Sequence, residues 1–341
     1  IGSEARILWY PVKAAFLAGE VHVGSADSVG TNSTSIGYRT IAMGNYSQAM
    51  GYKAQSLGLN STAIGNNAIA NSNNAFAFGN YAQTRGLNSF AFGDSAISDG
   101  ENSYALGSHA KALGKNSFAM GSFGIDADDF LTGPTIASGD YSYAFGMGSL
   151  ASGLLSLAFG GVNNATGVHS IAIGYGTTSS AINSIAIGLK NTASGPSSFA
   201  LGNYTTASGV FSTTLGNATV ASGEDATAMG EDSHANGDNS IAMGRASWAS
   251  ADNSVAIGLG INASGNKSFV FGCYSYATAE SAVAIGLGNT ACAYSSFALG
   301  YYSNAKGNYS VAIGNSTTAS GESSTSLGNN TKAKYNNSLA V

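Results

Sequence analysis

Apolar and small residues alternate along this chain in a short motif that recurs at a fixed spacing. One copy, residues 183–188, reads N-S-I-A-I-G, and its closing glycine returns every 14 residues from Gly37 to Gly121 and again from Gly146 to Gly328. A single interval of 25 residues separates Gly121 from Gly146. A short, fixed period of this kind predicts a solenoid in which each repeat stacks on its neighbours.

Each repeat contains two segments with the pattern of a β-strand. With the closing glycine as position 0, the residues at −3, −2 and −1 alternate apolar, small and apolar, as in Phe90-Ala91-Phe92. Positions +3 and +5 are mostly Ala, Ser or Thr, as in Ala110 and Ala112. Glycine at 0 and often at +7, and the Asn before the motif's Ser, are predicted to have positive φ at two corners. Each repeat is therefore predicted to form one coil of a parallel β-roll.

The distribution of small residues predicts which side chains lie inside the coil. Ser or Ala occupies −4 and mostly Ala occupies −2, whereas +4 is unrestricted and includes His234 and Trp248. The simplest interpretation is a thin coil with all the small positions inside and the large apolar residues at −3 and −1 outside. The alternative places the large residues inside and the Ser/Ala face at an interface. We favour the thin coil because short corners do not easily span a sheet separation of about 10 Å filled with Phe.

The apolar residues at −3 and −1 form a continuous stripe, called the apolar stripe below, which predicts self-association. A soluble monomer is not expected to expose such a stripe. Burial of each large side chain would contribute about 1.5–3 kcal/mol, as an upper bound before the loss of chain entropy. The predicted interface residues are Phe76, Phe78, Phe90, Phe92, Ile171, Ile173, Ile185, Ile187, Val255, Ile257, Val283, Ile285, Val311 and Ile313.

The N-S-x-A-x-G series over about residues 31–341 resembles the head domain of YadA-like trimeric autotransporter adhesins. Such repeats are also seen in secreted bacterial and phage-like trimeric fibre proteins. The resemblance implies an all-β, left-handed parallel β-roll, a homotrimer, and a non-enzymatic extracellular binding role at the bacterial outer surface. The residues themselves indicate only an oligomer, and the three-fold symmetry comes from the resemblance.

Residues 1–30 lie outside the repeat and include an apolar run at residues 7–19. The run is too short for a membrane span and is interrupted by Pro11 and Lys13. We expect an apolar cap or neck that seals the first coil. The run also resembles, less specifically, the openings of secreted bacterial fibre proteins. Because residues 337–341 stop inside a copy of the motif, we expect the repeat domain to continue beyond residue 341.

The 25-residue interval predicts an inserted loop at about residues 122–136. Long loops on rigid scaffolds often carry function. Three aspartates would suit Ca²⁺, but they lack the EF-hand spacing, and a solvated loop without metal is the favoured interpretation. The candidate functional residues of this loop are Phe123, Asp126, Asp128, Asp129 and Phe130.

Composition argues against most other functions. Charged residues are only 9% of the chain and the formal net charge is −5, so no basic stripe for nucleic acid is expected. The four His residues occupy different positions in the repeat, and Cys273 and Cys292 point in different directions, so no metal site or disulfide is predicted. No Ser, His and Asp recur together as a catalytic triad. We expect no enzyme, no cofactor and no membrane contact within these residues.

Aromatic residues at outward positions are the candidates for ligand binding. Exposed Tyr and Trp present flat apolar faces with a polar edge, which suits sugars or protein partners. The candidate residues are Trp248, Tyr274, Tyr276, Tyr301 and Tyr302.

The sequence therefore predicts a trimeric adhesin head or receptor-binding fibre that attaches to a host, matrix or cell surface. Glycans, extracellular matrix proteins and surface proteins are the partners considered. Two alternatives remain open at this stage. One is a structural subunit of an extracellular filament that assembles end to end, and the other is a tail fibre of a phage or contractile injection particle.

Overall fold

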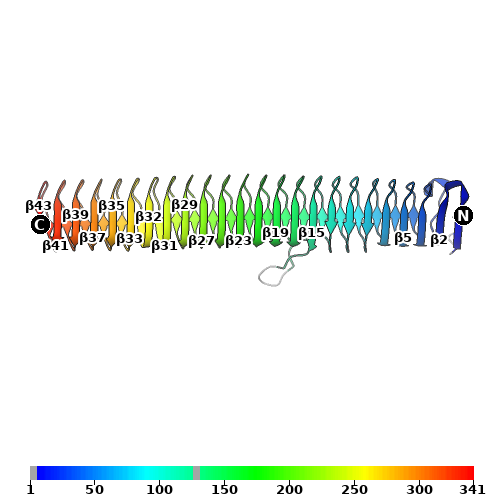
Figure 1. The fold of residues 1–341 in the computed structure, drawn as a ribbon, viewed down its shortest axis with the longest axis horizontal. Helices are drawn as coiled ribbons and strands as arrows, with labels where there is room; N and C mark the ends of the chain where they lie inside the picture. The colour runs from blue at the N-terminus through cyan, green and yellow to red at the C-terminus, as the bar shows by residue number, and fades with distance from the viewer. Residues whose placement is uncertain (1–5, 126–130) are drawn as a thin grey trace. The chain divides into compact units, whose positions relative to one another are not determined.

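The computed structural model describes residues 6–125 and 131–341, and in these residues β-strands form almost all of the regular structure. The chain divides into two compact units, Ile1–Thr177 and Thr178–Val341. In each unit, strands from successive repeats lie side by side (Figure 1). Residues at the same position of successive coils pair in parallel, as Phe90 does with Tyr104. The predicted parallel β-solenoid with two short strands per coil is confirmed.

In the first unit, the first strand of each coil contains the motif and the second strand contains positions +4 and +5. The first strands are β3 (Thr34–Tyr38), β5 (Gln48–Tyr52), β7 (Thr62–Asn66), β9 (Phe76–Phe78), β11 (Phe90–Phe92), β13 (Tyr104–Leu106), β15 (Phe118–Ser122), β17 (Tyr143–Met147), β19 (Leu157–Gly161) and β21 (Ile171–Tyr175). The second strands are β4 (Ile41–Ala42), β6 (Gln55–Ser56), β8 (Ile69–Ala70), β10 (Gln83–Thr84), β12 (Ile97–Ser98), β14 (Lys111–Ala112), β16 (Ile136–Ala137), β18 (Leu150–Ala151) and β20 (Asn164–Ala165).

The second unit repeats the same arrangement. Its first strands are β23 (Ile185–Leu189), β25 (Phe199–Asn203), β27 (Thr213–Asn217), β29 (Thr227–Glu231), β33 (Phe269–Cys273), β35 (Val283–Leu287), β37 (Phe297–Tyr301), β39 (Val311–Asn315), β41 (Thr325–Asn329) and β43 (Leu339–Ala340). Its second strands are β22 (Thr178–Ser179), β24 (Thr192–Ala193), β26 (Thr206–Ala207), β28 (Val220–Ala221), β30 (His234–Ala235), β34 (Tyr276–Ala277), β36 (Thr290–Ala291), β38 (Asn304–Ala305), β40 (Thr318–Ala319) and β42 (Lys332–Ala333).

Two neighbouring coils of the second unit differ from the prediction of two short strands. There the strands run on as single nine-residue strands, β31 (Ile241–Ala249) and β32 (Val255–Ala263). The reason is an additional pairing between the two coils, of Ser247 with Ile261 at position +3, which joins the first-strand and second-strand pairings into one ladder.

Small side chains fill the interior of the coils, as the thin-coil interpretation predicts. Ala77, Ala186 and the other alanines at −2 are fully buried, and the serines at −4 are buried with them. Residues at −3 and −1 are only half-buried or exposed, as at Ile185 (half-buried) and Phe92 (exposed). The alternative, with the large residues inside, is wrong for this chain. The residues at −4 and −2 are the buried ones, and the opposing strands pack so closely on these Ser and Ala side chains that a Phe would not fit between them.

The corners use positive φ at three places in most coils. In the coil of Gly188 these are Gly188 itself (φ 124°), Lys190 at +2 (φ 52°) and Asn183 at −5 (φ 56°). The prediction of positive φ for the +7 glycines is wrong, as Gly209 shows. Glycine suits +7 for a different reason, because a Cβ on Gly209 would lie 1.9 Å from the carbonyl oxygen of the next coil's Gly223.

Residues outside the repeat pair with its first coil. β1 (Arg6–Tyr10) and β2 (Ala15–Glu20) form an antiparallel hairpin around the short 3₁₀ helix η1 (Pro11–Lys13), and η2 (Ala26–Ser28) follows. β2 then pairs in parallel with β3. We propose that this hairpin is the cap expected from the sequence, because it covers the strand edge of the first coil.

Replacing Ala186 by Leu is expected to lower the free energy of unfolding by about 3 kcal/mol or more, because the fully buried alanine leaves no room for a larger side chain. Thermal unfolding followed by circular dichroism measures this loss. Ile185→Leu is the matched control on the outer side of the same strand and should cost less than about 1.5 kcal/mol. An Ala186→Leu protein that unfolds like the wild type would mean that the inner and outer sides have been exchanged.

Candidate functional site

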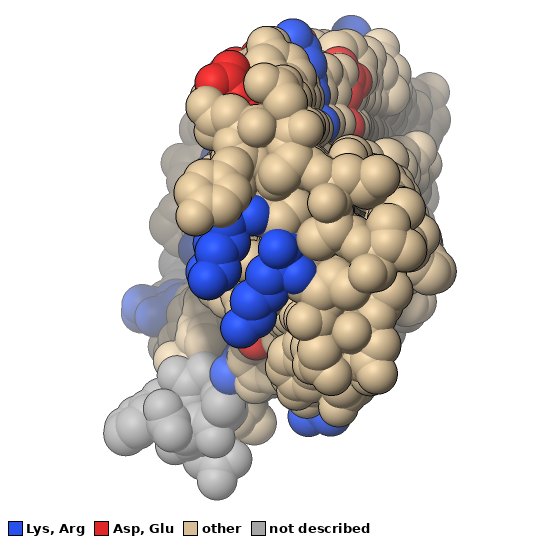
Figure 2. Space-filling model, turned by 90° about the vertical axis from the view of Figure 1, so that its left-hand side faces the viewer, with Lys and Arg blue, Asp and Glu red and all other residues tan. Residues whose placement is uncertain are grey.

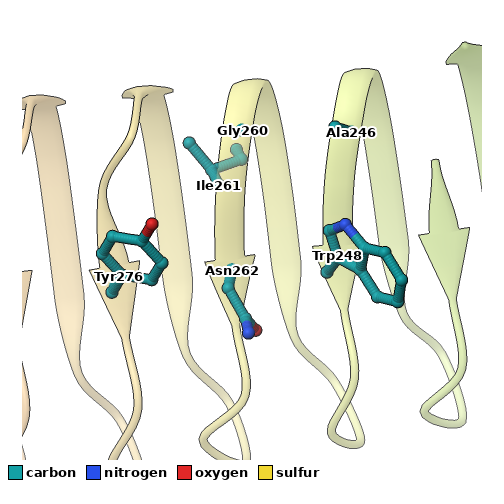
Figure 3. Close-up of a pocket in the computed structure, with 6 residues that line it drawn as sticks. All are labelled: Ala246, Trp248, Gly260, Ile261, Asn262 and Tyr276. Atoms are coloured by element: carbon teal, nitrogen blue, oxygen red, sulfur yellow. The ribbon is translucent and has the colours of Figure 1, made fainter. Parts of the chain in front are cut away.

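Trp248, Asn262 and Tyr276 lie in register at position +4 of three successive coils. Trp248 pairs with Asn262, and Asn262 pairs with Tyr276. The three side chains project outward because +4 lies between the buried positions +3 and +5. Figure 3 shows the rings of Trp248 and Tyr276 on either side of Asn262.

An open cavity of about 250 Å³ lies between these two rings, and we call it the aromatic cavity. Its lining residues are Ala246, Trp248, Gly260, Ile261, Asn262 and Tyr276 (Figure 3). The hollow exists because position +2 is occupied by Ala246 and Gly260, whereas other coils place larger side chains there, such as Lys190 and Tyr204. The cavity therefore results from small residues at a corner and large residues on the neighbouring strands.

The other predicted aromatic residues lie beside the cavity or farther along the unit. The ring of Tyr274 packs over Gly260, since a Cβ on that glycine would lie 2.9 Å from the ring. Tyr301 and Tyr302 form an edge-to-face pair with ring centroids 4.5 Å apart, and Tyr302 packs over Gly288 in the same way. Of the five predicted ligand-binding residues, Trp248 and Tyr276 are thus the two that line the cavity.

The sequence interpretation missed a neighbour of this site. His234 stacks on Trp248 with ring centroids 4.1 Å apart and an interplanar angle of 11°. Its Nε2 lies 3.2 Å from Oδ1 of Asp232. The sequence does contain a signal for this contact. His234 and Trp248 are 14 residues apart and both occupy position +4, so their rings lie on paired strands of successive coils. The stack supports Trp248 from the side opposite the cavity.

The apolar stripe is partly open to solvent in both units. In the first unit, Phe76 stacks on Phe90 at 4.8 Å and Phe78 stacks on Phe92 at 4.9 Å between centroids, with nearly parallel rings. Phe92 remains 47% exposed despite these contacts. In the second unit the predicted interface residues, such as Ile185, are half-buried. Stacking within the chain therefore covers the faces that neighbouring rings turn toward each other but leaves their outer edges exposed.

The base of the inserted loop is held by backbone hydrogen bonds. The amide of Gly124 donates to the carbonyl of Gly133 at 3.1 Å, and the amide of Thr132 donates to the carbonyl of Gly124 at 2.8 Å. Ile125 and Leu131 form an antiparallel bridge. Of the predicted functional residues of the loop, Asp126, Asp128, Asp129 and Phe130 lie outside the described residues.

Two side chains attach the loop base to the coils. The hydroxyl of Tyr175 donates to the carbonyl of Ile125 at 2.8 Å, across 50 residues of chain. Phe123, the remaining predicted loop residue, has its ring 4.6 Å from the ring of His109. The base of the insert is thus fixed to coils that precede and follow it.

Charged side chains are few, and those that pair do so at the surface. Lys115 Nζ lies 3.0 Å from a carboxylate oxygen of Glu101, and Arg245 Nε lies 3.4 Å from a carboxylate oxygen of Glu231. The hydrogen bond to Glu101, followed by its negative charge, raises the pKa of Lys115 above its usual value. Exposed pairs of this kind contribute little to stability. On the face seen in Figure 2, uncharged residues cover most of the surface.

In residues 6–125 and 131–341 the His, Cys, Asp and Glu side chains are not gathered into a metal site. In this part of the chain no group of three or more His, Cys, Asp or Glu side chains is placed to hold a metal ion. Cys273 and Cys292 are free. None of the helices described is long and apolar enough to cross a membrane.

Comparison with models of protein families matches the YadA head domain repeat along most of the chain. A comparison with curated protein sequences gave no match. The inserted loop, at 124–136, and a stretch that includes much of the aromatic cavity, at 261–292, lie between matched segments. The matched segments are residues 28–54, 44–68, 56–82, 70–96, 98–123, 137–163, 151–177, 165–191, 179–205, 193–219, 221–245, 235–260, 293–317 and 319–341.

Replacing Tyr175 by Phe is expected to loosen the loop base, because it removes the hydroxyl that donates to Ile125. Hydrogen–deuterium exchange of peptides that contain Thr132 should become faster, while the global free energy of unfolding falls by no more than about 1.5 kcal/mol. Tyr81→Phe, at an exposed tyrosine of the same unit outside the apolar stripe, is the matched control. Unchanged exchange in Tyr175→Phe would show that this bond does not hold the loop base.

Proposed function

This chain belongs to the YadA head repeat family, and we therefore propose that it is the head of a trimeric adhesin that attaches a bacterium to a host, matrix or cell surface. The family consists of non-catalytic adhesins, so the chain is not assigned an enzymatic activity. Adhesins of this family are exposed at the bacterial outer membrane, and we place this chain there by membership.

The observation that carries the proposal is the apolar stripe. Each coil contributes two residues to it, and side chains such as Phe78 and Phe92 remain 37% and 47% exposed in the single chain. An apolar surface repeated over so many coils is far longer than the patches that soluble monomers expose. The family implies a homotrimer, and three copies of this stripe facing a common axis would cover one another.

Burial of the stripe explains why the coil needs no large core of its own. The interior consists mainly of Ala, Ser and Thr, which bury little apolar area per residue. Each large side chain covered by association would contribute about 1.5–3 kcal/mol as an upper bound. We infer that assembly supplies much of the stability of the folded head, while the outward second strands and the loop stay available for attachment.

Ile185→Asp tests the interface. A carboxylate at this position would be buried without a partner in each copy, at a cost of several kcal/mol per chain. Light scattering on the wild-type chain should give about three times the monomer mass of 34.0 kDa, and the variant should give a lower mass at equal concentration. Thr192→Asp, on the second strand of the same coil, is the matched control and should keep the wild-type mass. A monomeric wild-type protein would refute the interface.

Attachment itself is tested with the intact wild-type oligomer. Beads coated with the protein should adhere to at least one surface in a panel of immobilised extracellular matrix proteins and intact cells, and beads coated with Ile185→Asp should adhere less. Adhesion to none of them, together with open-ended polymers in electron micrographs, would favour the filament subunit instead.

A further inference from the structure

The aromatic cavity has the features of a ligand site. We propose that it binds a neutral saccharide, with Trp248 and Tyr276 contacting the sugar faces and Asn262 contacting a hydroxyl group. The inference rests on the proposed attachment function and names one class of molecule that the head recognises.

The two rings are placed to contact the same ligand from its two ends. Trp248 and Tyr276 are 39% and 44% exposed, and they lie two strands apart with Asn262 between them. Strands in a sheet lie about 4.8 Å apart, so the two side chains begin about 10 Å from each other along the sheet. Aromatic faces of this kind pack against the C–H groups of a sugar ring without requiring charge.

The floor of the cavity supplies space and a polar group. Ala246 leaves its corner open, Gly260 makes room for the ring of Tyr274, and Ile261 is buried beneath the cavity at 1% exposure. Within the described residues, Oδ1 of Asn262 has no hydrogen-bond partner. This oxygen is itself buried, and Asn262 contributes to the lining of the cavity an amide side chain, which is able to donate to and accept from hydroxyl groups. Figure 3 shows the Asn262 side chain rising from the strand between Trp248 and Tyr276, with its amide end pointing away from Gly260 and Ile261.

The charges near the cavity favour a neutral ligand over an ionic one. No acidic or basic residue is among its lining residues. Arg245, which precedes the lining residue Ala246, is paired with Glu231. Asp232 is engaged by His234 on the far side of Trp248. A cationic ligand would find no free carboxylate here, and an acidic sugar would find no free guanidinium.

The position of the cavity distinguishes it from the repeated surface. Ile261, Asn262 and Tyr276 lie in the stretch 261–292 between matched family segments. The strands beneath it are also exceptional, since β31 and β32 run on without interruption. The two uninterrupted strands are therefore a local departure from the two-strand coil, and they coincide with part of the cavity.

The chain contains two tryptophans, which permits a direct test. In the Trp9→Phe protein, Trp248 is the remaining tryptophan, and its emission is excited selectively at wavelengths where tyrosine does not absorb. We would titrate this protein with cellotetraose, maltotetraose and N-acetylchitotetraose as neutral probes, and with tetragalacturonic acid and choline as acidic and cationic probes. We expect a saturable change in Trp248 emission with at least one neutral probe and none with the two charged ones.

Variants then assign the response to the cavity. Tyr276→Ala in the same background should weaken binding by roughly ten-fold, since it removes one of the two rings. Asn262→Leu should also weaken it, while Tyr309→Ala, an exposed tyrosine away from the cavity, should leave it unchanged. Absence of a response to all neutral probes, a response to the charged probes alone, or full binding by Tyr276→Ala would overturn the proposal.

The same variants separate this inference from the attachment function. If wild-type beads adhere and Tyr276→Ala beads adhere equally well, while no neutral probe changes the emission, then the saccharide site is refuted and attachment by another surface stands. If wild-type beads adhere to nothing while a neutral probe binds as expected, the attachment function fails on its own.

Discussion

The thinness of the coil is the constraint on which the rest of this structure depends. Two short strands face each other across an interior filled mostly by Ala, Ser and Thr, with Ile261, Val270 and a few asparagines as exceptions, so most large residues lie outside. The hydroxyl at −4 is not what the interior requires, because Ala75, Ala226 and Ala282 occupy the same position. Several serines there also lack a hydrogen-bond partner in the described residues. The size of a side chain, more than its polarity, therefore determines whether it fits in the interior of the coil.

The same constraint explains the exceptions in the interior. Asn289 is fully buried at +3, where its Nδ2 donates to the carbonyls of Ile285 at 2.6 Å and Gly300 at 2.7 Å, and its Oδ1 accepts from the amide of Ser303 at 2.8 Å. Each of these hydrogen bonds joins the side chain to a backbone group of its own coil or of the next coil. A polar side chain is therefore tolerated inside only where stacked backbone groups satisfy it. Asn163 and Asn191 occupy +3 of their own coils with equivalent bonds.

The fold was largely predictable from the sequence because one local period encodes both the register and the inside–outside division. The alternation at residues such as Phe90, Ala91 and Phe92 identified the first strands and the correct packing. Features that depend on contacts between coils were not predictable. Two examples are the close approach of the next coil's backbone to Gly209 and the stack of His234 on Trp248. Both depend on the distance between the backbones of adjacent coils, and the residue type at one repeat position does not give that distance.

The candidate site was predictable in part for a related reason. Trp248 and Tyr276 could be recognised as outward and aligned because the period fixes their position. The cavity between them, however, depends on the lack of large side chains at Ala246 and Gly260. A small residue at a corner does not by itself indicate a binding site. It forms a cavity only in combination with the large rings on the neighbouring strands, whose positions the structure supplies.

The two sides of one thin coil suggest how this chain combines assembly with recognition. The apolar stripe lies on the outer side of the first strands, and the +4 side chains lie on the outer side of the second strands, with buried Ala and Ser between them. Association through the stripe would leave the second strands uncovered. Under the two proposals, substitutions at +4 would alter ligand contacts without disturbing the coil interior or the proposed interface, because the +4 side chains lie on the outer side of the second strands. The unrestricted composition of +4, from Thr192 to Trp248, is consistent with this separation of roles.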